Sequence, residues 1–219
     1  MTSKNKILCT IISAIVVLVS VVAIALINNH SDFKLNSSKG NVSATYTDEY
    51  KAISYANLVE IDEKEIWNNK ELNIISGTIK DTNNIKLKVG GDVSYDSLVK
   101  IEVSDCIKGN VKSGEVIEVL AGCLTNPKGI WQEDCMVNSS MTKGDFGIFM
   151  IEENHTSIES GNSILQLSDI ARYNFPDAMH YCFVEKENEV IYFKDFYVEL
   201  EDSSDINYIK EYINGKLAE

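Results

Sequence analysis

The segment from Ile7 to Ile27 is mostly apolar and has no charged side chain, and Lys4 and Lys6 come just before it. A helix of roughly 20 residues rises about 30 Å, which matches the thickness of the hydrocarbon core of a bilayer. This segment therefore predicts one transmembrane helix over residues 7–27. Lysines on the short N-terminal flank favour a cytoplasmic N-terminus, so the remainder of the chain should be extracytoplasmic.

A cleaved secretory signal is the alternative interpretation of residues 1–27. Such signals combine a basic start, an apolar stretch of about 7–15 residues and a small-residue cleavage site, for which Ala23 and Ala25 would serve. The apolar run continues beyond them through Leu26 and Ile27 and is longer than a typical signal core. We therefore favour the anchor, whereas cleavage would release a secreted domain.

The rest of the chain divides into a polar segment and one domain. Residues 28–47 are rich in Ser and Asn and show no sustained apolar period, which is typical of a flexible stalk. Residues 48–219 suffice to bury the core of a single domain of ordinary size. We expect this domain to carry helices at its N- and C-terminal ends.

Acidic residues dominate the charge of the chain, because 33 Asp and Glu stand against 20 Lys and Arg and give a formal net charge of -13. Such a surface repels nucleic-acid phosphates and anionic lipid headgroups, which argues against nucleic acid as a partner. Cations or basic protein patches fit better, although the charge also serves solubility alone. Arg172 is the only arginine, and Ile and Asn are abundant, a usage typical of AT-rich bacterial genomes. With the anchor, this usage indicates the outer face of a Gram-positive-type cell.

Apolar spacing predicts the two helices that flank the core. From Ala52 to Val59 the spacing is helical, and the helix extends in this interpretation to Trp67, whose ring we expect to pack in the core. The C-terminal helix follows a cap at Ser203 or Ser204. Its apolar residues lie three or four positions apart and share one face: Ile206, Ile209, Ile213 and Leu217.

Between the helices the apolar pattern has a period of two, which predicts β-strands. Val99, Ile101 and Val103 alternate with polar residues, and Gly77 interrupts a β-branched stretch at a point where a strand bulges or bends. Turn signals such as the one at residues 90–92 separate the strands. Short strands without alternating helices favour a small closed or nearly closed antiparallel barrel over a parallel α/β sheet. The further strands are expected over residues 115–120, 147–152, 180–184 and 190–200.

Three stretches of the domain carry a family resemblance. They are ISGTI at residues 75–79, LVKIEVSDCIKGNVKSGEVIEVL at residues 98–120 and GDFGIFM at residues 144–150. In order and pattern they resemble a family of small, largely uncharacterised extracytoplasmic proteins of Gram-positive bacteria. That family has a GxV strand, a strand ending in xxLKGxxKxGexIxV and a later GxxYLLFL strand. The resemblance implies a compact β-barrel similar to the OB or netrin-like fold, and it identifies no catalytic residues.

The chain departs from the family pattern at several positions. Ile107 stands in place of the usual leucine, residues 146–150 replace the Tyr-Leu-Leu motif, and Cys106, Cys123 and Cys135 are additions. The predicted fold class is accordingly mainly β (α+β). It consists of a small OB/netrin-like antiparallel barrel with flanking helices, preceded by one transmembrane helix.

Four cysteines follow the predicted anchor: Cys106, Cys123, Cys135 and Cys182. An even count in an oxidising compartment permits two disulfides, with three possible connectivities. Cys123 with Cys135 is the natural local pair, because the turn signal at residues 126–129 folds the chain back between them. Cys106 with Cys182 would then tie an early strand to a late one. Buried thiols are an alternative, and a zinc site with His180 is another, but no CxxC or HxxxH spacing supports it, so we expect no metal.

No stretch of the sequence carries a catalytic signature. A Gly-x-Ser-x-Gly elbow and a phosphate-cradling glycine loop are both missing from the sequence. In a catalytic dyad, the side chains of His180 and Cys182 would have to lie within hydrogen-bond distance of each other. Residues two positions apart on a strand rarely come that close. Adjacent acids such as Glu152 and Glu153 point to opposite sides of a strand, unlike a general acid and base. We therefore expect a protein that is not an enzyme and needs no cofactor.

The best candidate for a binding site is the long connection over residues 121–143. It carries Trp131, followed by Gln132, Glu133 and Asp134, and a bond between Cys123 and Cys135 would clamp it. Ordered loops of this length in a compact domain are often functional. A merely structural, stapled loop is the alternative.

Together these features predict a membrane-anchored extracytoplasmic binding or interaction module at the bacterial cell surface. Its partner would be a cell-surface or secreted protein. One alternative is an inhibitor or immunity-type protein that acts on an extracellular enzyme, since the netrin-like fold class includes protease inhibitors. A cell-envelope hydrolase is a further alternative, which predicts turnover that a chelator or the His180→Ala substitution abolishes.

Overall fold

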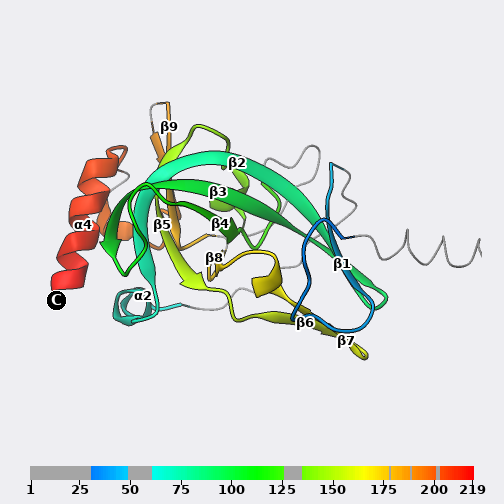
Figure 1. The fold of residues 1–219 in the computed structure, drawn as a ribbon. Helices are drawn as coiled ribbons and strands as arrows, with labels where there is room; N and C mark the ends of the chain where they lie inside the picture. Colours follow the sequence, from blue (N-terminus) through cyan, green and yellow to red (C-terminus); the bar gives the residue numbers. More distant parts are fainter. Residues whose placement is uncertain (1–30, 49–60, 126–134, 178, 188, 201–202) are drawn as a thin grey trace, which may run out of the picture.

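The computed structural model describes residues 31–48, 61–125, 135–177, 179–187, 189–200 and 203–219 (Figure 1). An eight-stranded sheet dominates them, with strand order β1-β2-β3-β4-β8-β5-β9-β10. Its strands are β1 (Val42–Tyr46), β2 (Asn73–Val89), β3 (Asp92–Lys108), β4 (Val116–Leu120), β5 (Phe146–Glu153), β8 (Tyr173–Asn174), β9 (Cys182–Lys186) and β10 (Glu189–Ile191). The prediction of a mainly β domain is confirmed.

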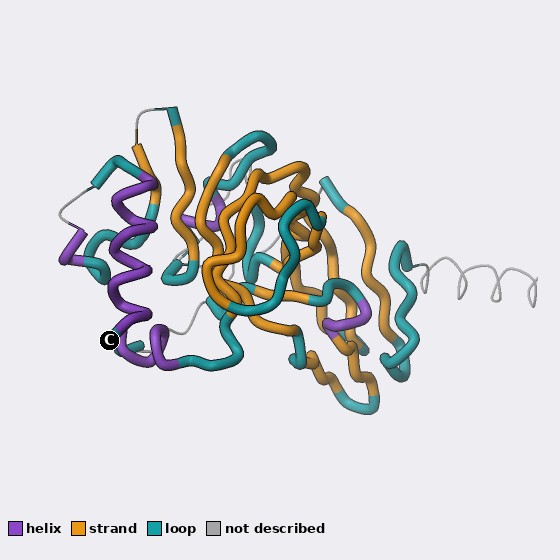
Figure 2. The backbone as a smooth tube through the Cα atoms, turned by 60° about the vertical axis from the view of Figure 1, so that its left-hand side comes forward, coloured by secondary structure: helices purple, strands orange, loops and turns teal. Residues whose placement is uncertain are grey.

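A small second sheet and a few helices complete the described structure. The second sheet pairs β6 (Ser157–Ser160) with β7 (Ser163–Gln166). The helices are α2 (Glu63–Asn68), α3 (Met136–Ser139) and α4 (Ile206–Ala218), with 3-10 turns η1 (Leu167–Asp169) and η2 (Val198–Leu200). Figure 2 shows α4 at one end of the fold and the N-terminal strand β1 at the other, when it is compared with the labels of Figure 1.

The long hairpin of β2 and β3 forms the frame of the sheet. Both strands have 17 residues, and they turn at Gly90, whose φ of 61° is open to glycine without strain. The register shifts between Ser76 and Gly77 and again between Ile79 and Asp81. Such bulges bend a strand and increase its twist, and the hairpin in Figure 1 curves accordingly. The predicted irregularity at Gly77 is confirmed.

Strand β2 pairs with two strands at once over its first part. Residues from Asn73 to Thr78 pair with β5 on one side, while β3 runs along the other. From β3 the pairing continues to β4, and β4 lies parallel to β8 through Val119 and Leu120. Strand β8 in turn pairs with β5. The pairings therefore lead from β2 through β3, β4, β8 and β5 back to β2.

Alternate side chains of these strands enter different apolar clusters. Ile75 and Phe149 belong to an inner cluster with residues of β3, β4 and β9, whereas Ile74 and Ile148, their neighbours in sequence, belong to an outer cluster beneath α4. Successive side chains of a strand point to opposite faces, so neighbours in sequence enter different clusters. A third cluster lies under β1 and β7 and includes Leu87.

The C-terminal helix covers the outer cluster as its apolar spacing predicts. Ile209 and Ile213 are fully buried, and Ile206 is nearly so. Its cap is Asp205, whose Oδ1 accepts the backbone N–H of Asn207 at 2.8 Å. The expected serine cap is thus wrong by one or two positions, because a carboxylate directly before the first turn takes that role.

The expectation of a flexible stalk over residues 28–47 is wrong for the part that the structure describes. Strand β1 pairs with β2 over five residues, and Ala44 is fully buried. Phe33 and Leu35 pack against the third cluster. The serines that indicated a stalk instead bind the domain, since Ser38 Oγ donates to Asp169 at 2.7 Å.

Two further predictions from the sequence agree with the structure only in part. The strand expected over residues 190–200 ends with β10, and the chain turns so that Tyr192 and Tyr197 enter the outer cluster. The helix expected around residues 52–59 lies outside the described residues, but α2 follows it and is capped by Asp62. Trp67 packs against the ring of Tyr197, which confirms its role as a packing residue.

The predicted transmembrane helix over residues 7–27 lies outside the described residues. Within the part of the chain that the structure describes, no helix is both long and apolar enough to cross a membrane. The anchor therefore stays a prediction.

Replacing Gly77 with alanine should lower the free energy of unfolding by about 2 kcal/mol, because overpacking between strands forces the backbone apart. The added Cβ would lie 2.5 Å from the carbonyl oxygen of Glu102. Chemical denaturation measures the loss. Gly91→Ala is the matched control, since its Cβ meets no atom within 4 Å and its stability should change by less than about 0.5 kcal/mol. Equal effects of the two substitutions would contradict the close strand packing at Gly77.

Candidate functional site

The four residues predicted to bind a partner, Trp131, Gln132, Glu133 and Asp134, lie outside the described residues. The structure does describe both ends of the connection that carries them, up to Thr125 and from Cys135 onward. The candidate site is therefore built from these two ends and the strands beside them.

Polar side chains of the β2–β3 hairpin hold the first end of the connection. Asn84 and Ser97 are paired residues of the two strands. The backbone N–H of Thr125 donates to Ser97 Oγ at 2.7 Å and to Asn84 Oδ1 at 3.2 Å, and Asn84 Nδ2 donates to the Thr125 carbonyl at 3.3 Å. Thr125 is buried. These bonds fix the point from which the connection departs.

The carboxyl group of Asp96 holds the same segment through its backbone. It accepts the N–H of Ser97 at 2.6 Å and hydrogen bonds from the backbone of Gly122 and Cys123, whereas the Ala121 N–H donates to the Ser97 carbonyl at 2.9 Å. Burial raises the pKa of Asp96 to about 7, although these hydrogen bonds favour the ionised form and oppose the rise. Asp96 therefore changes its charge near neutral pH, beside the start of the connection.

The second end of the connection is attached to the first by Asn138 of α3. This side chain is fully buried, and its Nδ2 donates to the carbonyl of Ala121 at 2.7 Å. Val137 and Met141, on either side of it in sequence, belong to the inner cluster. The connection thus starts and ends at neighbouring, rigid points of the core.

Cys123 and Cys135 lie together at these two ends. Both are buried, and their side chains are hydrogen-bonded to each other. This bond, followed by burial, raises the pKa of the Cys123 thiol well above its ordinary value. The structure contains no disulfide among its four described cysteines. The two thiols thus lie in contact, and the predicted bond between them stays a prediction.

The second predicted bond, between Cys106 and Cys182, is contradicted by the register of the strands. Cys106 pairs with Ile75, Ile75 with Phe149, and Phe149 with Cys182, so β2 and β5 lie between the two cysteines. Three strand spacings amount to roughly 14 Å, whereas bridged cysteines have Cα atoms within about 7 Å. The spacing of cysteines along the sequence cannot reveal this register.

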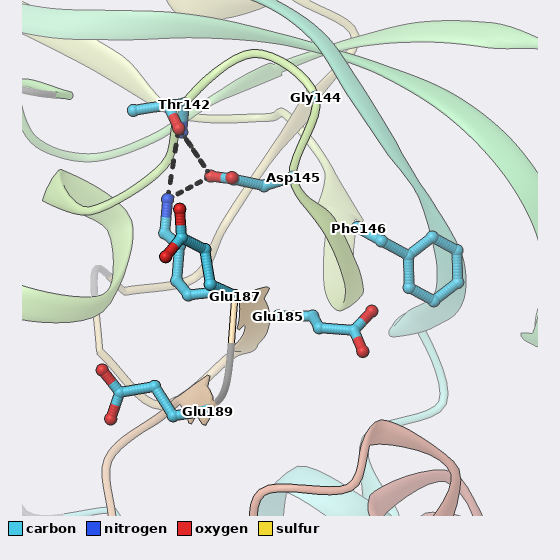
Figure 3. A pocket seen from close by; sticks show the side chains of 8 residues that line it. Thr142, Gly144, Asp145, Phe146, Glu185, Glu187 and Glu189 are labelled. Atoms are coloured by element: carbon cyan, nitrogen blue, oxygen red, sulfur yellow. Dashed lines mark hydrogen bonds and ion pairs between the residues drawn. The ribbon is translucent and has the colours of Figure 1, made fainter.

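A groove of about 830 Å³ lies where the connection enters β5 and meets the β9–β10 hairpin (Figure 3). Lys186 crosses it and donates to the Ser140 carbonyl at 2.7 Å and to Thr142 Oγ1 at 3.2 Å. It also forms an ion pair with Asp145, whose carboxylate accepts the Thr142 N–H at 2.7 Å. These contacts tie the end of the connection to β9 and give the groove a fixed floor.

Three glutamates line the same groove and give it a negative charge. Glu185, Glu187 and Glu189 are exposed, and none of them takes part in an ion pair with another described residue. The charge of Lys186 is already balanced by Asp145. The sequence signal for this groove was the motif EKENE at residues 185–189, which places several acids around a hairpin turn.

The strand expected over residues 180–184 begins only at Cys182, so His180 lies two residues before β9 and outside it. Its Nδ1 is 2.8 Å from Asp177 Oδ2, and the rings of Phe193 and Phe196 meet it edge-on. Burial acts to raise the pKa of Asp177, but hydrogen bonds from His180 and Met179 outweigh it and lower that pKa. Among the described residues no group of three Cys, His, Asp or Glu side chains is arranged to hold a metal ion. The pair fixes a turn against the aromatic cluster.

Comparison with known proteins adds no relative: no protein-family model, no curated protein and no solved structure matches this chain.

Between roughly pH 4 and 7, the free energy of unfolding of the original protein should fall by about 3 kcal/mol more than that of Asp96→Asn. Because the pKa of Asp96 rises from 3.8 in an ordinary setting to about 7 here, the folded protein retains a proton that the unfolded chain has released. Its contribution to stability is therefore complete below about pH 4 and is lost as the pH rises through about 7. Urea unfolding of both proteins at several pH values measures this difference.

The exposed residue Asp92 offers a control for that experiment. Asp92→Asn should leave the pH dependence of the free energy of unfolding as it is in the original protein. Parallel stability curves for Asp96→Asn and the original protein over this pH range would refute the assigned role of Asp96.

Proposed function

We propose that this chain is a membrane-anchored extracytoplasmic binding module at the surface of a Gram-positive-type cell, built on an OB/netrin-like barrel. The barrel is supported by the pairings that lead from β2 back to β2, all antiparallel except that of β4 with β8. A five-stranded, partly open barrel is the architecture of OB proteins. Helix α3 lies between the third and fourth of these strands and adds Val137 to the inner cluster.

One observation carries the binding proposal: the groove beside the long connection has a rigid floor and three exposed glutamates. Its floor is fixed by Lys186, Asp145 and Thr142, so little conformational entropy is lost when a partner binds there. Glutamates that have no cation within the described residues attract lysine or arginine side chains. A protein partner with a basic surface patch fits this site.

The position of the groove also supports the original candidate loop. Thr142, Gly144 and Asp145 line the groove and belong to, or directly follow, the connection over residues 121–143. A partner bound in the groove would therefore contact the described C-terminal end of this connection. The groove and the connection together form the proposed binding surface.

The triple substitution Glu185→Gln, Glu187→Gln and Glu189→Gln should weaken capture of the partner at least about tenfold, since several electrostatic contacts are lost together. Chemical crosslinking on intact cells that carry the tagged protein, followed by mass spectrometry, identifies the partner and measures its capture. Capture by the original protein should also fall when salt is raised to about 0.5 M, because salt screens exposed charges.

A variant with the same change in net charge controls for the general loss of acidity. Glu71, Glu159 and Glu211 are exposed and lie outside the groove. Their joint replacement by glutamine should leave capture unchanged. Equal capture by both triple variants, or capture of no protein above background, would count against the groove as the binding surface.

Deleting residues 1–27 should move the protein from the membrane fraction to the soluble fraction. With the full chain, protease added to intact cells should degrade the domain, because an anchor with cytoplasmic lysines leaves it outside. Fractionation and immunoblotting measure both effects. A domain protected from external protease until the cells are lysed would overturn the extracytoplasmic location.

A further inference from the structure

The two buried thiols at the ends of the long connection share a fixed frame. Cys123 follows Ala121, whose N–H donates to the Ser97 carbonyl at 2.9 Å, and Gly122, whose backbone hydrogen-bonds to Asp96. Cys135 precedes α3, where Asn138 donates to the carbonyl of Ala121 at 2.7 Å. Both cysteines are at most 3% exposed, and their side chains are in hydrogen-bond contact.

We propose that Cys123 and Cys135 are a modification site, whose two thiols are oxidised to a disulfide while the domain folds. Burial then keeps this disulfide away from solvent. The contact between the two side chains and the anchoring of both backbones carry this proposal. The bond would close the connection between β4 and α3. Its oxidant is a disulfide of the glutathione class or of a thiol–disulfide oxidoreductase.

The exchange takes place in two steps. The thiolate of one cysteine attacks a sulfur of oxidised glutathione, forms a mixed disulfide and releases one glutathione thiolate. The thiolate of the second cysteine then attacks the protein sulfur of that mixed disulfide and displaces the other glutathione. Two electrons pass from the cysteine pair to glutathione, and the two thiol protons end on the two glutathione molecules.

Burial explains why the reaction belongs to folding. Thiolate, and not thiol, is the nucleophile, and it must reach the oxidant. In the folded protein the pKa of Cys123 is well above its ordinary value, first through its hydrogen bond with Cys135 and then through burial. A chain that folds without oxidant therefore keeps its two thiols, whereas a chain that folds with oxidant keeps its disulfide.

The other described cysteines differ from this pair. Cys106 is partly exposed and is separated from Cys182 in register by the two strands β2 and β5. Cys182 is fully buried in β9, and burial raises the pKa of its thiol well above the ordinary value. Cys106→Ser is therefore a suitable control variant, because it removes a thiol and leaves the pair intact.

The test uses the full chain, purified in detergent and fully reduced. One sample is unfolded in urea and refolded in a mixture of reduced and oxidised glutathione, and a second, already folded sample receives the same mixture. Alkylation and peptide mass spectrometry then locate the linked cysteines. We expect Cys123–Cys135 in the refolded sample, in the original protein and in Cys106→Ser alike. The folded sample should react on the order of 100-fold more slowly.

A second measurement is the melting temperature of the two products. The linked protein should melt roughly 5–10 °C higher than its reduced form, since a closed loop restricts the unfolded chain. The double variant Cys123→Ser and Cys135→Ser should show no difference between the two buffers.

Several outcomes would overturn the proposal. They are an absence of disulfide after refolding, a bond from Cys123 or Cys135 to another cysteine, or equally fast oxidation of the folded protein. The natural supply of oxidant rests on the extracytoplasmic location proposed above. Thiols trapped by alkylation in intact cells test that location separately: a reduced pair in cells, with a disulfide formed on refolding, would overturn the location and leave the pairing.

Discussion

The double pairing of β2 is the constraint on which the rest of this structure depends. Over residues 74–78 the strand is paired with β3 and with β5, so its backbone has no free edge there. Ile74 and Ile75 consequently enter two different apolar clusters, one on each face. The small side of Gly77, opposite both Val103 and Gly147, lets three strands approach closely. Helix α3, the groove and α4 all take their positions from this junction.

Sequence periodicity predicted the strands that alternate clearly and failed where other interactions decide. The region around residues 80–84 is polar and charged, yet it continues β2 because its partner strand β3 runs beside it. Strand β8 has two residues, which is too short for any periodic signal. In residues 31–47 a few apolar side chains, Phe33, Leu35 and Ala44, suffice to bind the segment to the domain. A prediction from the average composition of the segment misses such single positions.

The candidate site could be located from sequence only to the level of a segment. Length, a tryptophan and two cysteines marked the connection over residues 121–143. The side chains that fix its ends, Asn84, Asp96 and Ser97, come from the β2–β3 hairpin, and nothing in their local sequence indicates that they meet Thr125 or Cys123. The register of the strands decides such contacts. Because the sequence does not reveal this register, the bond between Cys106 and Cys182 was also predicted wrongly. The groove beside Lys186 depends equally on contact between two segments distant in sequence, the turn before β5 and the β9–β10 hairpin.

If residues 7–27 are the proposed anchor, the contacts of Ser31 limit how far this domain would reach from a membrane. Ser31 already donates to the Ala44 carbonyl at 2.9 Å. With residues 7–27 as the proposed anchor, the linker is residues 28–30, which span about 10 Å even when fully extended. With that anchor, the β1 end of the domain would lie nearest the lipid surface, and β9 and α4, at the opposite end in Figures 1 and 2, would face away from it. A partner of the groove would have to approach from the cell-wall side, within one domain length of the bilayer.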